Sequence, residues 1–282
     1  MDDVSTVEAT FDHLAQDDPL WAVLSDPSRA GGRWTWAEFL ATGRADVDEV
    51  FQRLTELGAL PQEGRALDFG CGVGRLSQAL SGRFASVDAV DVSGRMIELA
   101  RTAAEGPPGL RFHHNSRPDL GGFADASYDL VLSLLVVQHI PPALSRAYLK
   151  EFARLLKPGG VAVFDAPSHT RPSLDPMALY RWAAPAPLQR RLRQLRWGRH
   201  GMSQIYLLPR REVLAILEAS GLEVVTADRR DVVARGTACY RYVAKRTSGP
   251  QPAAVRAIRR SRVSTIGALG HGSRTVRAAA LT

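Results

Sequence analysis

The sequence predicts an α/β fold with a doubly wound, mostly parallel sheet, helices ahead of that sheet and a helical insertion near its end. From Arg65 onward, short apolar segments alternate with segments of helical period, and a glycine-rich turn joins the first pair. Such alternation indicates a parallel sheet covered by helices on both faces. The 282 residues are enough for one domain of this kind with a cap.

Residues 1–63 are expected to form an N-terminal helical cap. In "WTWAEFLATGRADVDEVFQRLTEL", residues 34–57, apolar side chains recur mostly at three- and four-residue intervals. They are Phe39, Leu40, Val47, Val50, Phe51, Leu54 and Leu57. This spacing places them on one face of a helix. The following "GALPQEG" ends the helix, because Gly and Pro interrupt it.

Residues 64–170 are expected to form the α/β core. Its predicted strands are residues 65–69, 86–92, 110–115, 128–137 and 161–166. Its predicted helices are residues 75–84, 94–105 and 142–156, the last closed by "KPGG". Residues 204–249 then add one helix, ended by Gly221, and further strands that complete the sheet.

Charge divides the chain into an acidic body and two basic segments. Residues 1–170 hold 15 Lys or Arg and 23 Asp or Glu, whereas residues 171–211 hold nine Arg and one Asp. Residues 250–282 hold six Arg and no acid. We expect an Arg-rich helical lid at 171–203 and a flexible basic tail at 250–282, because the tail lacks aromatic residues and apolar periodicity.

Composition points to a cytoplasmic protein. The two cysteines, Cys71 and Cys239, are too few for a disulfide framework or a zinc site, and a reducing compartment is the simplest setting. The chain begins with an acidic segment, unlike a secretory signal, and lacks an apolar run of membrane-spanning length. No metal site is predicted.

The turn "DFGCGVG" follows the first core strand. Its glycines let a ligand approach bare backbone at the start of a helix. Their spacing is one residue shorter than in the dinucleotide fingerprint, and Asp68 precedes them. A carboxylate there disfavours a phosphate and favours an ammonium or sulfonium group. The P-loop and nucleophile-elbow motifs are absent, and Cys71 has no neighbouring His to activate it.

A second acid, Asp91, ends the next predicted strand about twenty residues later, where a carboxylate can bind ribose hydroxyls. The segments "ALDFGCGVGRLSQAL", "VDAVDVSGRMIELAR", "YDLVLSLLVVQHIPP" and "LKPGGVAVFDAPS" together resemble the successive motifs of class I S-adenosylmethionine-dependent methyltransferases. The resemblance runs from about Arg65 to Phe164 and implies a seven-stranded, Rossmann-like sheet that binds S-adenosylmethionine and releases S-adenosylhomocysteine. It says almost nothing about the acceptor.

The resemblance also implies roles for individual residues. Asp68 and the backbone of the glycine turn would hold the methionine amino end, and Asp91 would bind the ribose. The adenine would lie between Val92 and Met96; the alternative for Met96 is a residue that only packs its helix. The cofactor-binding set, in full, is Asp68, Gly70, Cys71, Gly72, Asp91, Val92, Met96, Asn115, Ser116, Leu134 and Arg44.

Three members of that set depart from the family pattern or have a plain alternative. Many members of the family carry "GDA" after the third strand, with the Asp on the adenine amino group, whereas this chain reads "HNSRPDL". Asn115 or Ser116 would have to supply that contact. Arg44 could meet the methionine carboxylate, or it could be a solvated helix residue.

Methyl transfer is an in-line displacement that needs alignment, exclusion of water and, for a hydroxyl acceptor, a base. His139, just past the fourth predicted strand, is the candidate base; the alternative is a histidine that packs the "HIPP" loop. His113, His114 and His169 are weaker candidates. Gln138, Arg191, Arg196 and Tyr206 are the candidate acceptor-binding residues.

The sequence therefore predicts a methyltransferase for a small molecule or a sugar of a glycan, acting by O-methylation. One alternative is an RNA-modifying methyltransferase that uses the basic insert and tail, but the motifs for base amines and pyrimidine carbon are missing. The other is a binding protein without transfer activity, since a fold does not fix a function. The Arg-rich lid could contact a membrane surface or clamp an anionic acceptor, or its helix could pack on the core.

Overall fold

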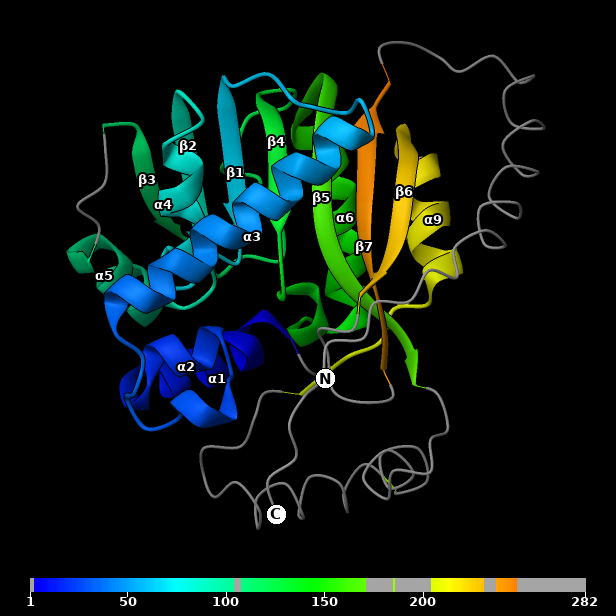
Figure 1. The fold of residues 1–282 in the computed structure, drawn as a ribbon. Helices are drawn as coiled ribbons and strands as arrows, with labels where there is room; N and C mark the ends of the chain where they lie inside the picture. The colour runs from blue at the N-terminus through cyan, green and yellow to red at the C-terminus, as the bar shows by residue number, and fades with distance from the viewer. Residues whose placement is uncertain (1–2, 104–107, 171–184, 186–203, 231–236, 248–282) are drawn as a thin grey trace, which may run out of the picture. The chain divides into compact units, whose positions relative to one another are not determined.

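The computed structural model describes residues 3–103, 108–170, 185, 204–230 and 237–247, and the described residues up to Arg246 form one compact unit. Its centre is a seven-stranded sheet in the order β3-β2-β1-β4-β5-β7-β6 (Figure 1). The strands are β1 (Arg65–Phe69), β2 (Ser86–Asp91), β3 (Leu110–His114), β4 (Tyr128–Ser133), β5 (Leu156–Thr170), β6 (Leu222–Arg230) and β7 (Thr237–Arg246). The first five strands of this order pair in parallel, and β7 is antiparallel to both its neighbours. The predicted mostly parallel sheet is confirmed.

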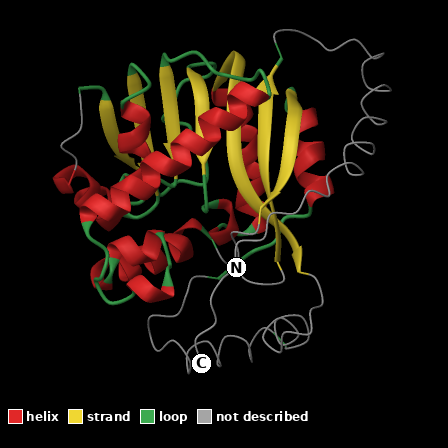
Figure 2. Cartoon of the chain, viewed as in Figure 1, coloured by secondary structure: helices red, strands yellow, loops and turns green. Residues whose placement is uncertain are grey.

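Helices cover both faces of this sheet (Figure 2). Helices α3 (Trp36–Glu56), α4 (Arg75–Ser81) and α5 (Gly94–Ala103) lie on one face, and α6 (Pro142–Leu155) and α9 (Arg210–Ala219) lie on the other. Because strand side chains alternate, Leu130 and Leu132 pack under α3 while Val131 packs under α6. Strands buried on both sides explain the continuous apolar runs in the sequence.

The N-terminal segment comprises α1 (Val4–Asp17), α2 (Pro19–Val23) and the 3₁₀ turn η1 (Pro27–Arg29), ahead of α3. Side-chain caps begin these helices: Asp3 accepts a hydrogen bond from the Thr6 amide, and Thr35 forms a reciprocal capping box with Glu38 at α3. Helix α1 packs against α5, beyond the ends of β1 and β2 at which the chain leaves the sheet (Figure 1). Helix α1 is thus placed at the carboxyl edge of the strands.

Two local features differ from the sequence expectation. The apolar stretch 128–137 was expected to be one strand, but β4 ends at Ser133 and a 3₁₀ turn, η2 (Val137–His139), follows. The chain reverses at Leu135, whose φ of 64° is incompatible with a strand. Strand β5 begins already at Leu156 and contains "KPGG", with a register shift opposite Tyr128 and Leu130. The expected lid, residues 171–203, lies outside the described residues except for position 185, and the tail from residue 250 lies wholly outside them.

Candidate active site

The glycine turn connects β1 to α4, and its glycines adopt left-handed backbone conformations. The φ values are 76° at Gly70, 53° at Gly72 and 89° at Gly74. A Cβ atom on Gly70 would lie 2.4 Å from the Val136 Cγ atoms, and one on Gly72 would lie 2.6 Å from Val23 Cγ2. Larger residues would therefore be strained and would also collide with the walls of the site.

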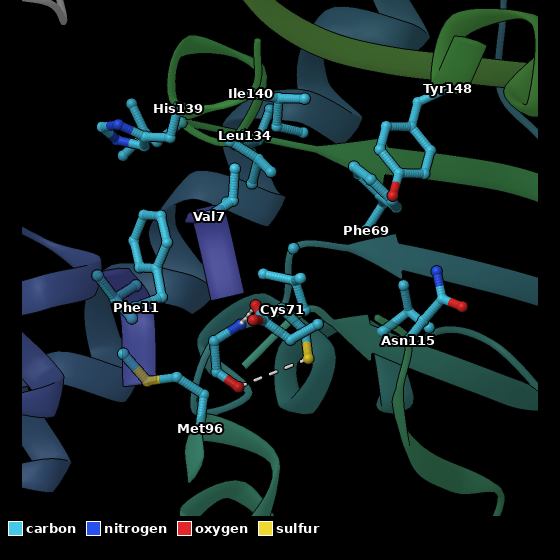
Figure 3. A pocket seen from close by; sticks show the side chains of 18 of the residues that line it. Val7, Phe11, Phe69, Cys71, Met96, Asn115, Leu134, His139, Ile140 and Tyr148 are labelled. Carbon is cyan, nitrogen blue, oxygen red and sulfur yellow. Dashed lines mark hydrogen bonds between the residues drawn. The ribbon is translucent and has the colours of Figure 1, made fainter. Parts of the chain in front are cut away.

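A pocket opens over this turn, at the carboxyl ends of β1, β2, β3 and β4 (Figure 3). In an open parallel sheet, this edge is where ligands bind. The structure brings nine of the predicted site residues together in its lining. They are Gly70, Cys71, Gly72, Asp91, Val92, Met96, Asn115, Leu134 and His139.

Other predicted residues lie elsewhere. Arg44 and Ser116 are exposed and, like Asp68, are not among the described residues that line the pocket. Gln138 and Tyr206 are outside the lining too, although Gln138 contacts the His139 ring and Tyr206 bonds to the Gln138 backbone. Arg191 and Arg196 fall outside the described residues. Sequence position alone could not separate Arg44, on the solvent side of α3, from a residue that points into the site.

Asp91 is fixed at the pocket edge by two backbone amides. Its Oδ2 atom accepts a hydrogen bond from the Gly72 amide and its Oδ1 atom from the Ser93 amide, both at 2.8 Å. The side chain is 9% exposed, and burial raises the pKa of Asp91. The carboxylate thus ties the end of β2 to the glycine turn and keeps acceptor capacity on both oxygens, since each can take more than one hydrogen bond.

Asp68 lies beneath the turn. Its Oδ2 atom accepts a hydrogen bond from the Ser77 hydroxyl of α4 at 2.5 Å, whereas Oδ1 has no partner among the described residues. The residue is 1% exposed, and burial raises the pKa of Asp68 to about 6. A buried oxygen without a partner is unusual in proteins and often marks a functional position. Asp68 therefore lies behind the backbone of the turn and outside the described pocket lining.

Arg75 is a pocket residue that the sequence analysis missed. It begins α4 and is 3% exposed, and its Nη1 atom donates to Asp46 Oδ2 at 2.5 Å and to Thr42 Oγ1 at 3.2 Å. Its Nε atom has no partner among the described residues. A cation at a helix N-terminus interacts unfavourably with the helix dipole. An arginine at the predicted helix start was therefore the feature of the sequence that could have marked Arg75 as a site residue.

Helix α1 supplies a second part of the lining that the sequence analysis missed. Val4, Val7 and Phe11 lie on one face of α1 and contribute to the pocket. Polar side chains hold the helix in place: Asp12 Oδ1 accepts hydrogen bonds from Ser93 Oγ at 2.5 Å and from the Arg95 amide at 3.2 Å. The spacing of three and four residues between these apolar side chains was visible in the sequence. The surface that this face of α1 covers was not.

His139, on η2, faces Phe11, with the ring centroids 5.5 Å apart and the rings edge to face (Figure 3). Its Nδ1 atom lies 3.4 Å from the Gln204 carbonyl oxygen, and its Nε2 atom lies 3.0 Å from the Gln138 amide nitrogen. These contacts fit a neutral ring with the proton on Nδ1, so that Nε2 accepts from Gln138. Burial lowers the pKa of His139 to about 4. The imidazole is therefore unprotonated near pH 7.

The remaining predicted side chains have structural partners. His113 contacts Asp88, and His114 contacts Glu8 and the Val92 carbonyl. His169 lies beside Ser168. The Tyr206 amide donates to the Gln138 carbonyl at 2.7 Å, which places residues 204–206 against η2. None of the three histidines lines the pocket as its described residues define it.

Neither a metal cluster nor a membrane-spanning helix is present in the part of the chain that the structure describes. Within it, the His, Cys, Asp and Glu side chains form no group of three or more that could hold a metal ion. Among the described helices, none combines the length and the apolar character needed to cross a bilayer.

The α/β core of this chain is similar in sequence to domains of known proteins. Residues 67–164 match the family described as "Methyltransferase domain". Curated relatives include the ubiquinone biosynthesis O-methyltransferases of Paracidovorax citrulli, 30% identical over 131 residues, and of Xanthomonas oryzae pv. oryzae, 34% identical over 115 residues. These alignments cover 42% and 40% of this chain and 54% and 45% of the relatives. The chain thus matches about half the length of either relative.

Among solved structures, the fold is similar to magnesium protoporphyrin IX methyltransferase from Synechocystis PCC 6803 with bound S-adenosylhomocysteine. The TM-score is 0.58 at 21% identity, covering 87% of this chain and all of the other. The same enzyme with bound S-adenosylmethionine gives 0.55 at 20% identity, over 88% of this chain and 98% of that one. At this identity the likeness shows the fold alone.

Proposed function

We propose that this chain, which contains a methyltransferase domain of the class I S-adenosylmethionine-dependent family, transfers a methyl group to a hydroxyl oxygen of a small molecule. The observation that carries the proposal is one pocket that holds the glycine turn, the Asp91 carboxylate and a buried arginine together. The O-methyltransferase names of the relatives support the acceptor atom. The products would be S-adenosylhomocysteine and the methylated acceptor.

The lining fits the nucleoside part of the cofactor. Both oxygens of Asp91 retain acceptor capacity, which suits two vicinal ribose hydroxyls. Val92 and Met96 provide apolar surface for adenine. The Asn115 amide nitrogen already donates to the Asp119 carbonyl at 2.9 Å, so its oxygen is the atom left to meet the adenine amino group.

The methionine part would lie over the glycine turn. Its carboxylate pairs with Arg75 rather than Arg44, since Arg75 lines the pocket and its buried Nε atom lacks a partner among the described residues. Its amino group meets backbone carbonyls of the turn. When ionised, Asp68 supplies negative charge behind them, and this charge also favours the sulfonium.

The chain's own residues would supply alignment, a dry site and a base. When bound, the cofactor provides an electrophilic methyl group on a sulfonium. As the acceptor oxygen forms its bond to that methyl, the carbon–sulfur bond breaks and the hydroxyl proton passes to His139 Nε2, in the place the Gln138 amide holds in the structure. Burial lowers the pKa of His139 to about 4, so the imidazole is neutral and able to accept this proton near pH 7.

The test is binding and turnover of the full chain. Titration calorimetry with S-adenosylmethionine and S-adenosylhomocysteine measures the cofactor site, and release of S-adenosylhomocysteine in the presence of hydroxyl-bearing small molecules measures transfer. We expect saturable binding of both forms and product release that depends on the acceptor. Absence of cofactor binding would overturn the proposal. Binding without transfer to any of the acceptors would favour a binding protein instead.

A further inference from the structure

Helix α5 starts at the pocket, and α1 supplies a carboxylate to its first turn. We propose that this carboxylate, Asp12, is a positioning residue for the adenosine half of the cofactor and acts through Ser93. The role rests on the proposed function, because it requires that the S-adenosyl cofactor binds beside α5. Asp12 is outside the described pocket lining, so its effect on the cofactor has to pass through another residue.

Ser93 connects the ribose site to the adenine site. It is fully buried and is the N-cap residue of α5, since its Oγ atom accepts a hydrogen bond from the Met96 amide at 3.1 Å. Its own amide donates to Asp91 Oδ1 at 2.8 Å. Asp91 and Met96 both line the pocket. A shift of Ser93 would therefore displace the carboxylate that meets the ribose together with the apolar surface that meets the adenine.

Helix α5 begins without a negative charge of its own. A helix N-terminus leaves backbone amides without helical partners and carries a partial positive charge, so it favours an acid in the first turn. The first turn of α5 contains no acid, and the helix opens with Gly94 and Arg95. Glycine is a poor helix former, and the arginine adds positive charge where the dipole is already positive. A partner from elsewhere in the chain therefore stabilises this helix start.

Asp12 is that partner. Its Oδ1 atom accepts hydrogen bonds from the Ser93 hydroxyl at 2.5 Å and from the Arg95 amide at 3.2 Å. Because a hydroxyl has one hydrogen and two lone pairs, donation to Asp12 orients the Ser93 Oγ lone pairs toward the Met96 amide. A carboxylate 81 residues away in sequence thus completes the cap of α5 and fixes the orientation of the capping hydroxyl.

The alternative is that Asp12 only anchors α1, and a second polar contact of the same helix separates the two roles. One turn earlier, Glu8 Oε1 lies 2.9 Å from His114 Nε2 on β3. Removal of Glu8 leaves His114 its contact with the Val92 carbonyl oxygen, at 3.0 Å. Glu8 is therefore matched to Asp12 as an anchor of α1 but does not contact the cap of α5. If Asp12 positions the cofactor, only its own loss reaches the bound nucleoside.

The experiment measures the S-adenosylhomocysteine affinity of the full chain and its variants by titration calorimetry, at a temperature where circular dichroism shows each to be folded. D12A should weaken binding by about fivefold, the typical effect of losing a helix cap. D12N keeps an acceptor oxygen for Ser93 and should recover most of this loss. E8A is the matched control and should bind like the wild type. An unchanged affinity in D12A, or an equal loss in E8A, would overturn the role of Asp12.

The adenosine half is tested with 5′-methylthioadenosine, which has the nucleoside but lacks the amino acid. Its affinity is measured by displacement of S-adenosylhomocysteine. D12A should weaken both ligands by the same factor, because Ser93 contacts the residues that meet the nucleoside. A loss confined to S-adenosylhomocysteine would place the effect at the methionine end and overturn the assignment.

A double-mutant cycle tests whether Asp12 acts through Ser93. D12A should weaken S-adenosylhomocysteine binding far less when added to S93A than in the wild type, because the two side chains form one contact. Losses that multiply in the double variant would overturn the route through Ser93. The wild-type titration keeps the two proposals apart: absence of S-adenosylhomocysteine binding overturns the proposed function, whereas wild-type affinity retained in D12A overturns only the role of Asp12.

Discussion

The Arg75 guanidinium donates to the Asp46 carboxylate across the interface between α4 and α3, with Nη1 and Oδ2 2.5 Å apart. Gly43, one helical turn before Val47, lets α3 come this close, because a Cβ there would lie 2.2 Å from the Arg75 carbonyl oxygen. The pair holds a buried cation at the pocket, and the Arg75 Nε atom has no hydrogen-bond partner among the described residues.

We expect R75Q to weaken S-adenosylmethionine binding by about tenfold to a hundredfold, the loss of one charge-assisted hydrogen bond. Calorimetry on the purified chain measures this. The matched control is R44Q, a change at the exposed arginine of α3, which should leave the affinity unchanged. The reverse pattern would place the methionine carboxylate at Arg44.

Replacement of Asp91 by Asn keeps the shape and removes the charge. D91N should weaken cofactor binding by about tenfold to a hundredfold, because ribose hydroxyls lose a charged acceptor and the amide NH₂ faces a backbone N–H. E98Q, at an exposed acid of α5, serves as the control. Calorimetry measures the S-adenosylhomocysteine affinity of both variants. An affinity of D91N equal to that of the wild type would show that the ribose is held elsewhere.

H139A should reduce turnover by about 10²–10⁴-fold and leave cofactor affinity intact, since a positioned base contributes that much. H169A is the control, at a histidine outside the described pocket lining. In the wild type, the lowered pKa keeps the imidazole neutral from alkaline pH down to about pH 4, so turnover should persist at pH 5–6. Full turnover in H139A across pH 6–9 would remove His139 from the role of base.

Burial of Asp68 makes a prediction for stability. Its pKa is raised from 3.8 to about 6, so between these values the folded chain binds more protons than the unfolded one and loses stability as pH rises. The D68N variant lacks the titrating carboxyl and therefore this pH-dependent loss of stability. Its free energy of unfolding, relative to wild type, should therefore increase from pH 4 to pH 7, by up to about 3 kcal/mol. Urea titrations at several pH values check this, and a difference that is constant with pH contradicts it.

A chain that ends at Gly249 should keep its melting temperature and its cofactor affinity. The described residues up to Arg246 form one compact unit, and the sequence from Pro250 onward lacks an apolar face. Differential scanning calorimetry and cofactor titration compare the two chains. A fall of many degrees would show that the tail packs on the domain.

The parts of this site that were predictable from sequence are the local ones. Gly70 to Gly72, Asp91 and Met96 follow directly from strand ends and helix starts, where backbone geometry fixes what a side chain can reach. The contributions of Arg75 and Phe11 depend on how α3 and α1 pack on the sheet, and that packing joins residues far apart in the chain. The strand end at Ser133 depends on the backbone reversal at Leu135, which apolar periodicity does not reveal.

The anchoring of α1 has a consequence for biosynthesis. Asp12 and Ser93 are 81 residues apart in sequence, and Glu8 and His114 are 106 apart, so during synthesis α1 must wait for both partners. Closing such long loops is slow relative to forming local structure. Until β3 has been made, Val4, Val7 and Phe11 remain exposed to water on the nascent chain, and this interval is when α1 is most open to capture by chaperones or to aggregation.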